Sequence, residues 1–384
     1  MFWYWFFVGP ALALAALSLL GERKRAAYVV RRLAENSESL PPVTVIVPVK
    51  GPEEGLKENL AALAALDYPD YELIIVARAP ADLPPGVLPA RARIVLAHGD
   101  ISGHALYASE KVQNLLAAVH AARKRSQVYA FADSDGRPGP RWLRALVAPL
   151  AEEGVGASTG YRWFTPVPPT FWTLLRGVCN AAAGGLLGPG ANRFAWGGAV
   201  AIRKEVFSTA RVPEYWKRAV SDDYALTAAI RAAGLTIAYA PGALTPCFDH
   251  VGFRAMLAWM RRQMLLTRVY APRLWTEALL AHLFYCGGMA ASVIASIRGY
   301  RLAEWALIAQ LSPGMLKGLN RATLARAALP QCEAWFRRHA WVHAIWVPLA
   351  TWFWLVALAS SAAGNTIRWR GYSYNLSVRE DFRG

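Results

Sequence analysis

Two aspartates one residue apart, Asp133 and Asp135, stand directly after an apolar run, residues 129–132, that is typical of a buried strand. We expect both carboxylates at the carboxyl end of that strand, where open α/β sheets bind their ligands. Carboxylates this close repel each other unless a cation lies between them, and Arg137 is the only basic residue close by in sequence. The pattern therefore predicts a Mg²⁺ or Mn²⁺ site that completes its ligands with water and substrate phosphates. A plain Asp-Ser-Asp-Gly surface turn is the alternative.

A further carboxylate that could do chemistry is Asp223, in the run Ser-Asp-Asp-Tyr at 221–224. This run opens a predicted helix that ends before Gly234. A serine at the cap and two acids in the first turn suit a helix start. An acceptor hydroxyl is a weak nucleophile that needs a base, and Asp223 is a candidate for that role. An acid that only complements the helix dipole is the alternative.

The residues around these acids alternate between strand and helix patterns. The predicted strands are 43–47, 73–77, 93–96, 129–132, 155–161 and 200–203, and the predicted helices are 53–66, 109–125, 140–153 and 221–233. This alternation predicts an α/β catalytic domain with a mostly parallel sheet, over residues 41–250.

Composition and charge indicate a membrane-associated protein with an anionic substrate. The 384 residues are 55% hydrophobic and carry 42 Lys+Arg against 26 Asp+Glu, a formal net charge of +16. An anionic membrane surface attracts such a chain, and the 16 tryptophans that flank apolar runs favour the membrane interface. A nucleic-acid partner is not expected, because the aromatic residues gather in apolar segments instead of alternating with basic ones. The 4 cysteines are scattered and predict neither a disulfide framework nor a metal site.

The apolar segments predict a multi-pass integral membrane protein. Residues 1–21 form an expected N-terminal transmembrane anchor, since about 19 apolar residues span the hydrocarbon core. The charged cluster from Glu22 to Arg32 follows this run, so the positive-inside rule places the amino terminus outside and the catalytic domain in the cytoplasm.

Further membrane contacts are expected along the chain. Residues 170–188 predict a helix in the membrane interface, and 251–272 a basic amphipathic helix on it. A C-terminal membrane region, 273–384, contains about three apolar segments and a basic tail. The segments are 274–297, 302–316 (with Pro313 and Gly314, hence predicted to be re-entrant) and 341–363. Three spans would place the carboxyl terminus outside, whereas the tail arginines favour the cytoplasm, and the sequence leaves this conflict open. Those arginines are Arg368, Arg370, Arg379 and Arg383.

Five short motifs follow one another along the chain. They are Pro48-Val-Lys50-Gly51, Lys111-Val-Gln-Asn114-Leu115, Asp133-Ser-Asp135, Ser221-Asp222-Asp223-Tyr224 and Ile367-Arg-Trp369-Arg370-Gly371-Tyr372. In their order and spacing, and with the flanking membrane segments, they resemble the motifs of family-2 type glycosyltransferases with a GT-A fold. Within these, the membrane-bound ceramide glucosyltransferase-like group is the most similar. The resemblance covers nearly the whole chain.

This resemblance implies a hexosyltransferase that takes a nucleotide sugar, expected to be a UDP-sugar, and uses Mg²⁺ or Mn²⁺. It implies metal binding by Asp135 with help from Asp133. It also implies that Asp223 is the base that takes the proton of the acceptor hydroxyl, while that hydroxyl attacks the sugar with inversion. Lys111 and the pair Arg261 and Arg262 are candidates for binding the diphosphate charge. The residues expected at the donor are Pro48, Lys50, Lys111, Asn114, Asp133, Arg262 and Gln263, and those expected at the acceptor are Trp196, Gly197 and Gly198.

The chain departs from the group's pattern at two places. The second strand of the group ends in an aspartate that holds the nucleotide, and Ala79 occupies that position here, with Asp82 the only acid near. The Gln/Arg-x-x-Arg-Trp element after the base has Leu265 and Leu266 in place of Arg and Trp. Both departures concern donor or acceptor recognition.

The function that these features favour is transfer of one sugar to a lipid acceptor at the cytoplasmic membrane face. A processive polysaccharide synthase is a nearby alternative, but its channel needs more spans than this chain offers. A catalytically inactive membrane scaffold of the same fold is the alternative from another class. The joint presence of Asp133, Asp135 and Asp223 argues for the enzyme.

Overall fold

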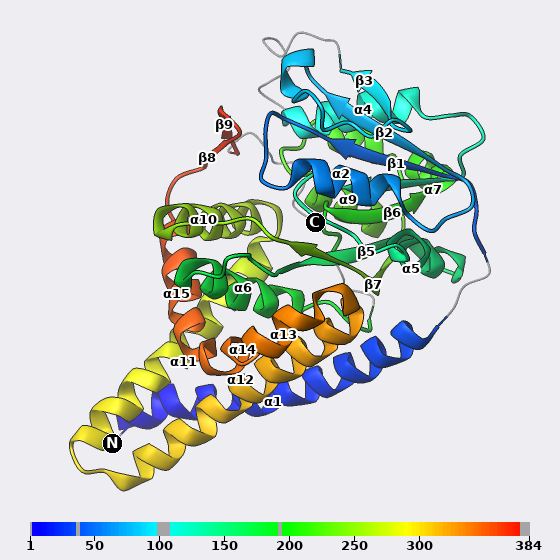
Figure 1. The fold of residues 1–384 in the computed structure, drawn as a ribbon. Coiled ribbons are helices and arrows are strands. Elements are labelled where there is room, and N and C mark those ends of the chain that lie inside the picture. Colours follow the sequence, from blue (N-terminus) through cyan, green and yellow to red (C-terminus); the bar gives the residue numbers. More distant parts are fainter. Residues whose placement is uncertain (1, 36–38, 98–107, 191–193, 377–384) are drawn as a thin grey trace.

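A seven-stranded mixed sheet forms the centre of the catalytic domain (Figure 1). The structure, a computed structural model, describes residues 2–35, 39–97, 108–190 and 194–376. The strands lie in the order β3-β2-β1-β4-β6-β5-β7. Their bounds are β1 Val43–Pro48, β2 Tyr71–Ala77, β3 Arg93–Leu96, β4 Val128–Ala132, β5 Val155–Phe164, β6 Ala199–Arg203 and β7 Thr236–Cys247.

Most neighbouring strands run parallel, as the sequence predicted. Strand β1 pairs in parallel with β2 and β4, and β2 with β3, whereas β6 runs antiparallel to both β4 and β5. Strand β4 therefore lies in the middle of the sheet, and its carboxyl end carries Asp133. Strand β7, parallel to β5, was not predicted from the sequence. It contains Pro241 and Pro246, which an edge strand tolerates.

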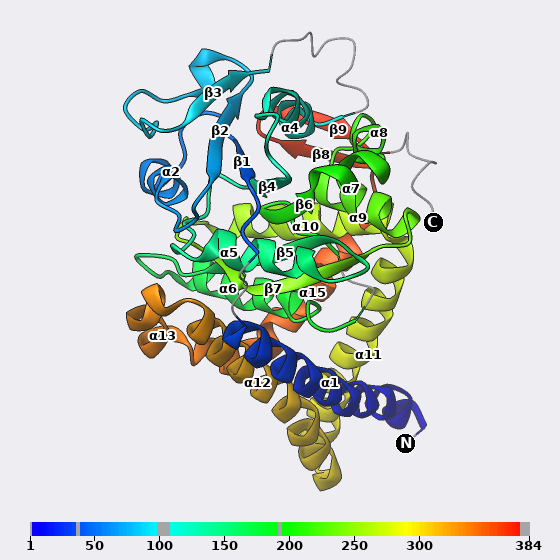
Figure 2. The same ribbon diagram turned by 90° about the vertical axis from the view of Figure 1, so that its right-hand side faces the viewer.

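Helices cover both faces of the sheet, because alternate residues of a strand point to opposite sides (Figure 2). Val45 and Val47 of β1 pack with Leu60 on one face, and Ile46 packs with Val112 on the other. The first face is covered by α2 (Leu56–Ala64) and α5 (Trp142–Val147). The second is covered by α4 (Glu110–Ala121), α7 (Lys204–Thr209), α8 (Val212–Trp216) and α9 (Asp222–Ala232).

Three long helices pack together and project away from the sheet, namely α1 (Phe2–Ala34), α11 (Pro272–Ile297) and α12 (Arg301–Ala328) (Figures 1 and 2). Among the described residues, two helices, α1 from Trp3 and α11, are long and apolar enough to cross a membrane. The prediction of a re-entrant segment is wrong. Residues 302–316 belong to the continuous helix α12, which contains Pro313 in its interior.

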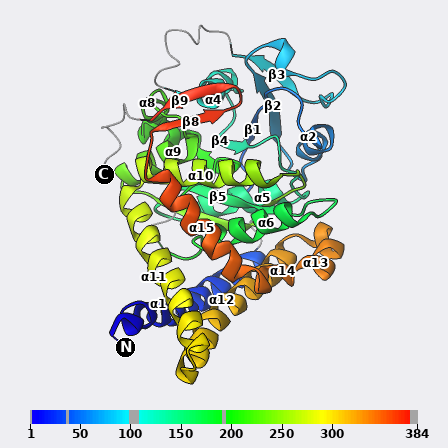
Figure 3. The same ribbon diagram turned by 90° about the vertical axis from the view of Figure 1, so that its left-hand side faces the viewer.

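The chain returns from this bundle to the catalytic domain. The short helices α13 (Glu333–His339) and α14 (Val342–Ile345) lead to α15 (Val347–Ser361), which packs on α6 (Phe171–Gly184) and α10 (Phe253–Tyr270) (Figure 3). A hairpin of β8 (Thr366–Trp369) and β9 (Tyr372–Asn375) then contacts the start of α4. Arg368 and Arg370 thus lie beside the catalytic domain, and the side of the membrane on which the tail lies stays a prediction. Arg379 and Arg383 lie outside the described residues.

The amphipathic helices contact protein over much of their length. In α6, the side chains of Leu175, Val178 and Cys179 are buried against Met260 of α10 and Trp354 of α15. The exposed Phe171 stands at the amino end of α6. The placement of α6 and α10 at a membrane interface stays a prediction.

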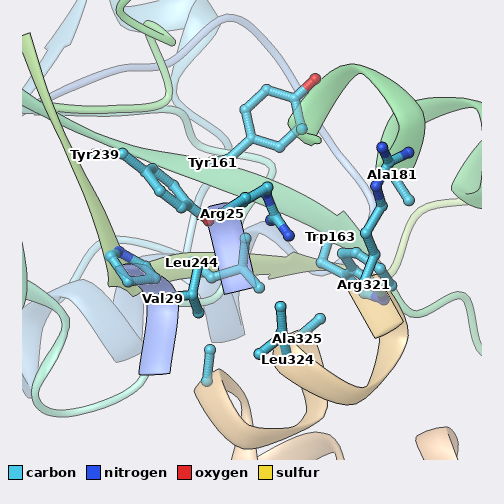
Figure 4. A pocket seen from close by; sticks show the side chains of 13 residues that line it. Arg25, Val29, Tyr161, Trp163, Ala181, Tyr239, Leu244, Arg321, Leu324 and Ala325 are labelled. Carbon is cyan, nitrogen blue, oxygen red and sulfur yellow. The ribbon is translucent and has the colours of Figure 1, made fainter. Parts of the chain in front are cut away.

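The second half of α1 is docked on the catalytic domain. The hydroxyl of Tyr28 donates a hydrogen bond to the carbonyl of Tyr239 (2.7 Å), and Arg25 Nε donates to the carbonyl of Leu187 (2.9 Å). Arg25 also lines a small cavity of about 10 Å³ together with Arg321 of α12, at the junction shown in Figure 4. A volume of this size is about that of one water molecule. Part of the basic cluster after the first apolar run therefore joins the long helices α1 and α12 to the catalytic domain.

Candidate active site

One large cavity, of about 1620 Å³, lies at the carboxyl ends of β1 and β4. All residues that the sequence predicted for the donor, the metal and the base line it, and so do Trp196 and Gly197. Gly198 packs behind them, where a Cβ would stand 2.3 Å from the Trp196 ring and 2.7 Å from Asp133 Oδ2. The fold therefore brings the candidate residues together from segments that are far apart in the sequence.

The two aspartates after β4 are neutralised by protein side chains. Arg162, on β5, donates through Nη2 to Asp133 Oδ2 (3.1 Å) and through Nη1 to Asp135 Oδ2 (3.0 Å). Lys111 Nζ, on α4, donates to Asp133 Oδ1 (2.8 Å). Arg137 is the only basic residue near the pair in sequence, but β5 and α4 bring two more cations to it in the folded protein.

These contacts shift the two carboxyl groups in opposite directions. Burial favours the neutral form of Asp133, but Lys111 and Arg162 outweigh it and hold the pKa of that carboxyl below its ordinary value. Burial raises the pKa of Asp135, and the single contact with Arg162 does not compensate. Asp133 is therefore the more strongly ionised member of the pair.

A divalent cation fits this site if most of its ligands come from the substrate. Asp135 Oδ1 is buried and has no hydrogen-bond partner, whereas both oxygens of Asp133 are engaged. In the described part of the chain, no three His, Cys, Asp or Glu side chains gather closely enough to hold a metal by themselves. Mg²⁺ and Mn²⁺ sites with one or two carboxylates and substrate phosphates have this composition.

The first turn of α9 presents two acids with different surroundings. Asp222 is buried, and its Oδ2 lies 3.1 Å from Lys111 Nζ. Burial raises the pKa of Asp222 to about 6 despite this contact. Asp223 accepts hydrogen bonds from the amide of Tyr224 at Oδ1 (2.8 Å) and from the amide of Gly197 at Oδ2 (3.4 Å). Ser221 stands at the N-cap position of α9, as predicted, but its hydroxyl donates to Asp223 Oδ1 and accepts no hydrogen bond from a backbone amide of the first turn.

The part of the cavity beside β1 and α4 holds further polar groups. Lys50 Nζ contacts Glu110 and lies 4.4 Å from the centroid of the Tyr372 ring. The Oδ1 atom of Asn114 is buried without a hydrogen-bond partner. Lys111, expected at the diphosphate, lines the cavity and joins Asp133 to Asp222. Of the two arginines expected with it, Arg262 lines the cavity and Arg261 is not among the lining residues.

The C-terminal hairpin packs on the two leucines that depart from the pattern of the similar group. Leu265 and Leu266 of α10 pack in one buried cluster with Ile367, Tyr374 and Leu376. The hairpin side chains Ile367, Trp369, Arg370, Tyr372 and Tyr374 all line the cavity. The apolar replacements at 265 and 266 thus allow the hairpin to form one wall of the site.

The other departure has a local explanation. Asp82 Oδ2 accepts a hydrogen bond from the backbone amide of Ala79 (3.1 Å), so this acid closes a turn after β2. Ala79 and Asp82 are not among the residues that line the cavity.

Sequence reasoning missed several charged residues of the cavity. Arg162 stands in an otherwise buried strand, and that position is a signal that could have been noticed. Asp222 was treated only as a neighbour of Asp223. Asp249 follows β7 and pairs with Arg176 of α6 (2.8 Å), a contact that depends on a strand the sequence did not predict.

Another part of the cavity is lined mainly by apolar side chains, namely Trp259 and Met264 of α10, Leu274 and Ala278 of α11, and Trp354 of α15. The ion pair of Arg273 and Glu277 (3.0 Å) also lines it, in the first two turns of α11. One part of the cavity is thus lined by the acids and their cations and another mainly by apolar side chains, two of them on a helix long enough to cross a membrane.

A family model described as glycosyl transferase family 21 matches residues 4–381. The chain belongs to glycosyl transferase family 21. It is therefore a glycosyltransferase of the ceramide glucosyltransferase-like, GT-A type that uses a nucleotide-sugar donor, as the motifs indicated.

The solved structures that match this chain include a mannosyltransferase and a glucosyl-3-phosphoglycerate synthase. A mannosyltransferase from Pyrobaculum calidifontis in complex with GDP-mannose and Mn²⁺ is 20% identical, with a TM-score of 0.47, over 93% of this chain and 97% of the other. Glucosyl-3-phosphoglycerate synthase from Mycobacterium tuberculosis, in complex with Mn²⁺, UDP-glucose and phosphoglyceric acid, is 18% identical. Its TM-score is 0.38, over 57% of this chain and 75% of the other. No curated protein matches the chain.

Proposed function

We propose that this family 21 enzyme transfers a single sugar, with inversion, from a nucleotide sugar to a lipid acceptor at the cytoplasmic face of the membrane. The observation that supports a lipid acceptor is the cavity itself, which runs from the acidic cluster to the start of α11. A lipid whose chains lie along α11 and α15 could place its hydroxyl among the acids without leaving the membrane.

Different residues of the cavity carry out the different steps of sugar transfer. A bound Mg²⁺ or Mn²⁺, held by Asp135 with Asp133, would stabilise the charge that develops on the departing diphosphate. Asp223, at the amino end of α9, takes the proton from the acceptor hydroxyl. Its Oδ2 is oriented by the amide of Gly197, on the Trp196-Gly197-Gly198 loop that we assign to the acceptor.

Inversion follows from direct attack. The acceptor hydroxyl attacks the sugar from the face opposite the diphosphate, so one displacement inverts the anomeric centre. Lys111 keeps Asp133 and Asp222 in place, and Arg262 adds positive charge to the donor side of the cavity.

The decisive experiment follows labelled sugar into lipid. Membranes that contain the protein are incubated with a panel of labelled UDP- and GDP-sugars, and the lipids are then extracted and analysed by mass. We expect one donor to give a lipid that carries one sugar, and membranes with the Asp223→Asn variant to give none. Label in a long polymer would favour a processive synthase, and no transfer from any donor would favour the inactive scaffold.

A further inference from the structure

Arg162 occupies the place between Asp133 and Asp135 where a divalent cation would bind. Each terminal nitrogen of its guanidinium contacts a different carboxylate, at 3.1 and 3.0 Å. A planar fork with two parallel donors suits such a bridge, which a lysine ammonium could not form in the same way. The second oxygen of Asp133 accepts from Lys111, so each oxygen of that carboxylate has a cationic partner.

Apart from the two carboxylates, the buried guanidinium of Arg162 lies near aromatic rings. The side chain of Arg162 is only 15% exposed, and it lies 4.8 Å from the centroid of the Trp196 ring and 5.6 Å from that of Phe164. Ring faces attract a cation without fixing its direction as strictly as a hydrogen bond does. Arg162 itself lines the cavity, so its charged end borders the space that the donor would enter.

Charge repulsion explains why Arg162 cannot stay between the two aspartates once the divalent cation and the nucleotide sugar are bound. A divalent cation at the two aspartates would place two positive charges beside the charge of Arg162, and like charges at this distance repel strongly in a partly dry site. The incoming diphosphate offers the displaced guanidinium a new partner. Arg262 lines the same cavity as Arg162, so a diphosphate bound there would have two guanidinium groups within the same space.

We propose that Arg162 is an exchangeable counter-cation of the aspartate pair. It neutralises Asp133 and Asp135 before the donor arrives, yields this place to the divalent cation when the nucleotide sugar binds, and then binds the diphosphate beside Arg262. The inference rests on the metal site of the proposed function, but not on the lipid acceptor. It makes Arg162 a donor-binding residue and makes metal binding depend on the nucleotide.

The test measures Mn²⁺ binding to the purified full-length protein, by titration followed through the electron paramagnetic resonance signal of free Mn²⁺. Wild-type protein should bind Mn²⁺ weakly alone and at least about tenfold more tightly with UDP or GDP present, which corresponds to about 1.4 kcal/mol of coupling. Arg162→Met should bind Mn²⁺ alone at least tenfold more tightly than wild type, because the competing cation is gone. The same variant should bind the nucleotide more weakly.

Two further variants control this test. Arg261→Met removes an equal charge from α10, where the guanidinium contacts the carbonyls of Ser360 and Ala363 instead of the acids, and should bind Mn²⁺ like wild type. Arg162→Lys keeps the charge but not the fork and should give an intermediate affinity. It also serves if the methionine variant does not fold.

Several results would overturn the proposal. If the folded Arg162 variants bind Mn²⁺ no more tightly than wild type, the arginine is only a structural clamp. If neither variant folds, the wild-type coupling decides, and equal Mn²⁺ affinity with and without nucleotide refutes the exchange. No acceptor is present in these titrations, so failure of lipid transfer leaves their outcome untouched.

Discussion

A Cβ on Gly197 would lie 2.2 Å from Oδ2 of Asp222, closer than real atoms approach. The backbone of Gly197 is also engaged in the site, since its amide donates to Asp223 Oδ2 (3.4 Å) and its carbonyl accepts from Lys111 Nζ (3.5 Å). This single glycine therefore joins the acceptor loop to both acids of α9 and to the lysine of α4.

Gly197→Ala should for this reason impair turnover much more than a typical glycine replacement. Insertion of a methyl group into a packed site costs about 1–3 kcal/mol, and here the displaced group is the Asp222 carboxylate. We expect turnover to fall at least about tenfold, measured as sugar transfer per mole of folded protein. Gly252→Ala is the matched control, because a Cβ there meets no atom within 4 Å and the backbone is unstrained (φ −90°). Equal turnover in the two variants would show that the loop is not tightly packed.

Asp223→Asn separates a catalytic role from a helix-capping role. The substitution keeps size and shape and removes the proton acceptor, so turnover should fall at least about a hundredfold, the lower end of what a positioned base contributes. Nucleotide affinity should change little. If Asp223 only supports the start of α9, the variant should lose about 0.5–1 kcal/mol of stability and keep its turnover. Turnover and melting temperature measured on one preparation distinguish the two outcomes.

We expect the protonation of Asp222 to change the stability of the protein with pH. Burial raises its pKa from 3.8 to about 6 in the folded protein, so between these values the folded state holds a proton that the unfolded state has lost. The contribution of this group to the free energy of unfolding therefore falls as pH rises through that window. Asp222→Asn mimics the protonated form and avoids this loss.

The melting temperature of Asp222→Asn relative to wild type should accordingly rise between pH 4.5 and pH 6.5. Thermal unfolding in detergent, without metal or nucleotide, measures it. Asp82→Asn, which changes an acid outside the cavity wall, is the control and should not show this trend. A relative melting temperature for Asp222→Asn that is flat or falls with pH would mean that Lys111 fully compensates the buried charge.

The pattern of neighbouring residues in the sequence was sufficient to predict where the acids of the site lie in the fold. The run 129–132 is fully apolar, so it had to be a buried strand, and Asp133 and Asp135 had to follow it at the sheet edge. The start of α9 was equally clear from its acids. These predictions depended only on neighbours in sequence.

Features that depend on distant contacts could not be predicted in this way. Two prolines argued against strand β7, and only its place at the sheet edge makes them acceptable. The partner of Asp133 and Asp135 comes from β5, and nothing in the local sequence names Arg162 as that partner. Leu265 and Leu266 looked like lost recognition residues until the hairpin that packs on them was placed.

The orientation in the membrane can be tested with single cysteines, because all four native cysteines are buried. Lys57, exposed on α2, reports the catalytic domain, and Arg298, exposed at the end of α11, reports the turn between α11 and α12. In Figure 1 this turn and the amino terminus lie together at the end of the bundle away from the sheet. A cytoplasmic catalytic domain therefore predicts that an impermeant maleimide labels Arg298→Cys but not Lys57→Cys in intact cells.

Permeabilised cells provide the control for this labelling, since both cysteines should then react. Labelling of Lys57→Cys alone in intact cells would reverse the orientation. Labelling of both would show that the bundle does not cross the membrane.

The metal requirement can be tested through Asp135, whose unpaired Oδ1 is the available ligand atom at the end of β4. EDTA should abolish sugar transfer, and added Mn²⁺ or Mg²⁺ should restore it. Asp135→Asn should lower transfer by several orders of magnitude with normal expression, because a neutral amide oxygen binds a divalent cation far less well than a carboxylate. The variant should also bind Mn²⁺ weakly in the presence of nucleotide, a readout that does not depend on the acceptor. Asp82→Asn is again the matched control, with normal transfer and EDTA sensitivity. Full activity in EDTA would mean that Arg162 and Lys111 alone stabilise the departing diphosphate, and the metal site would then have to be abandoned.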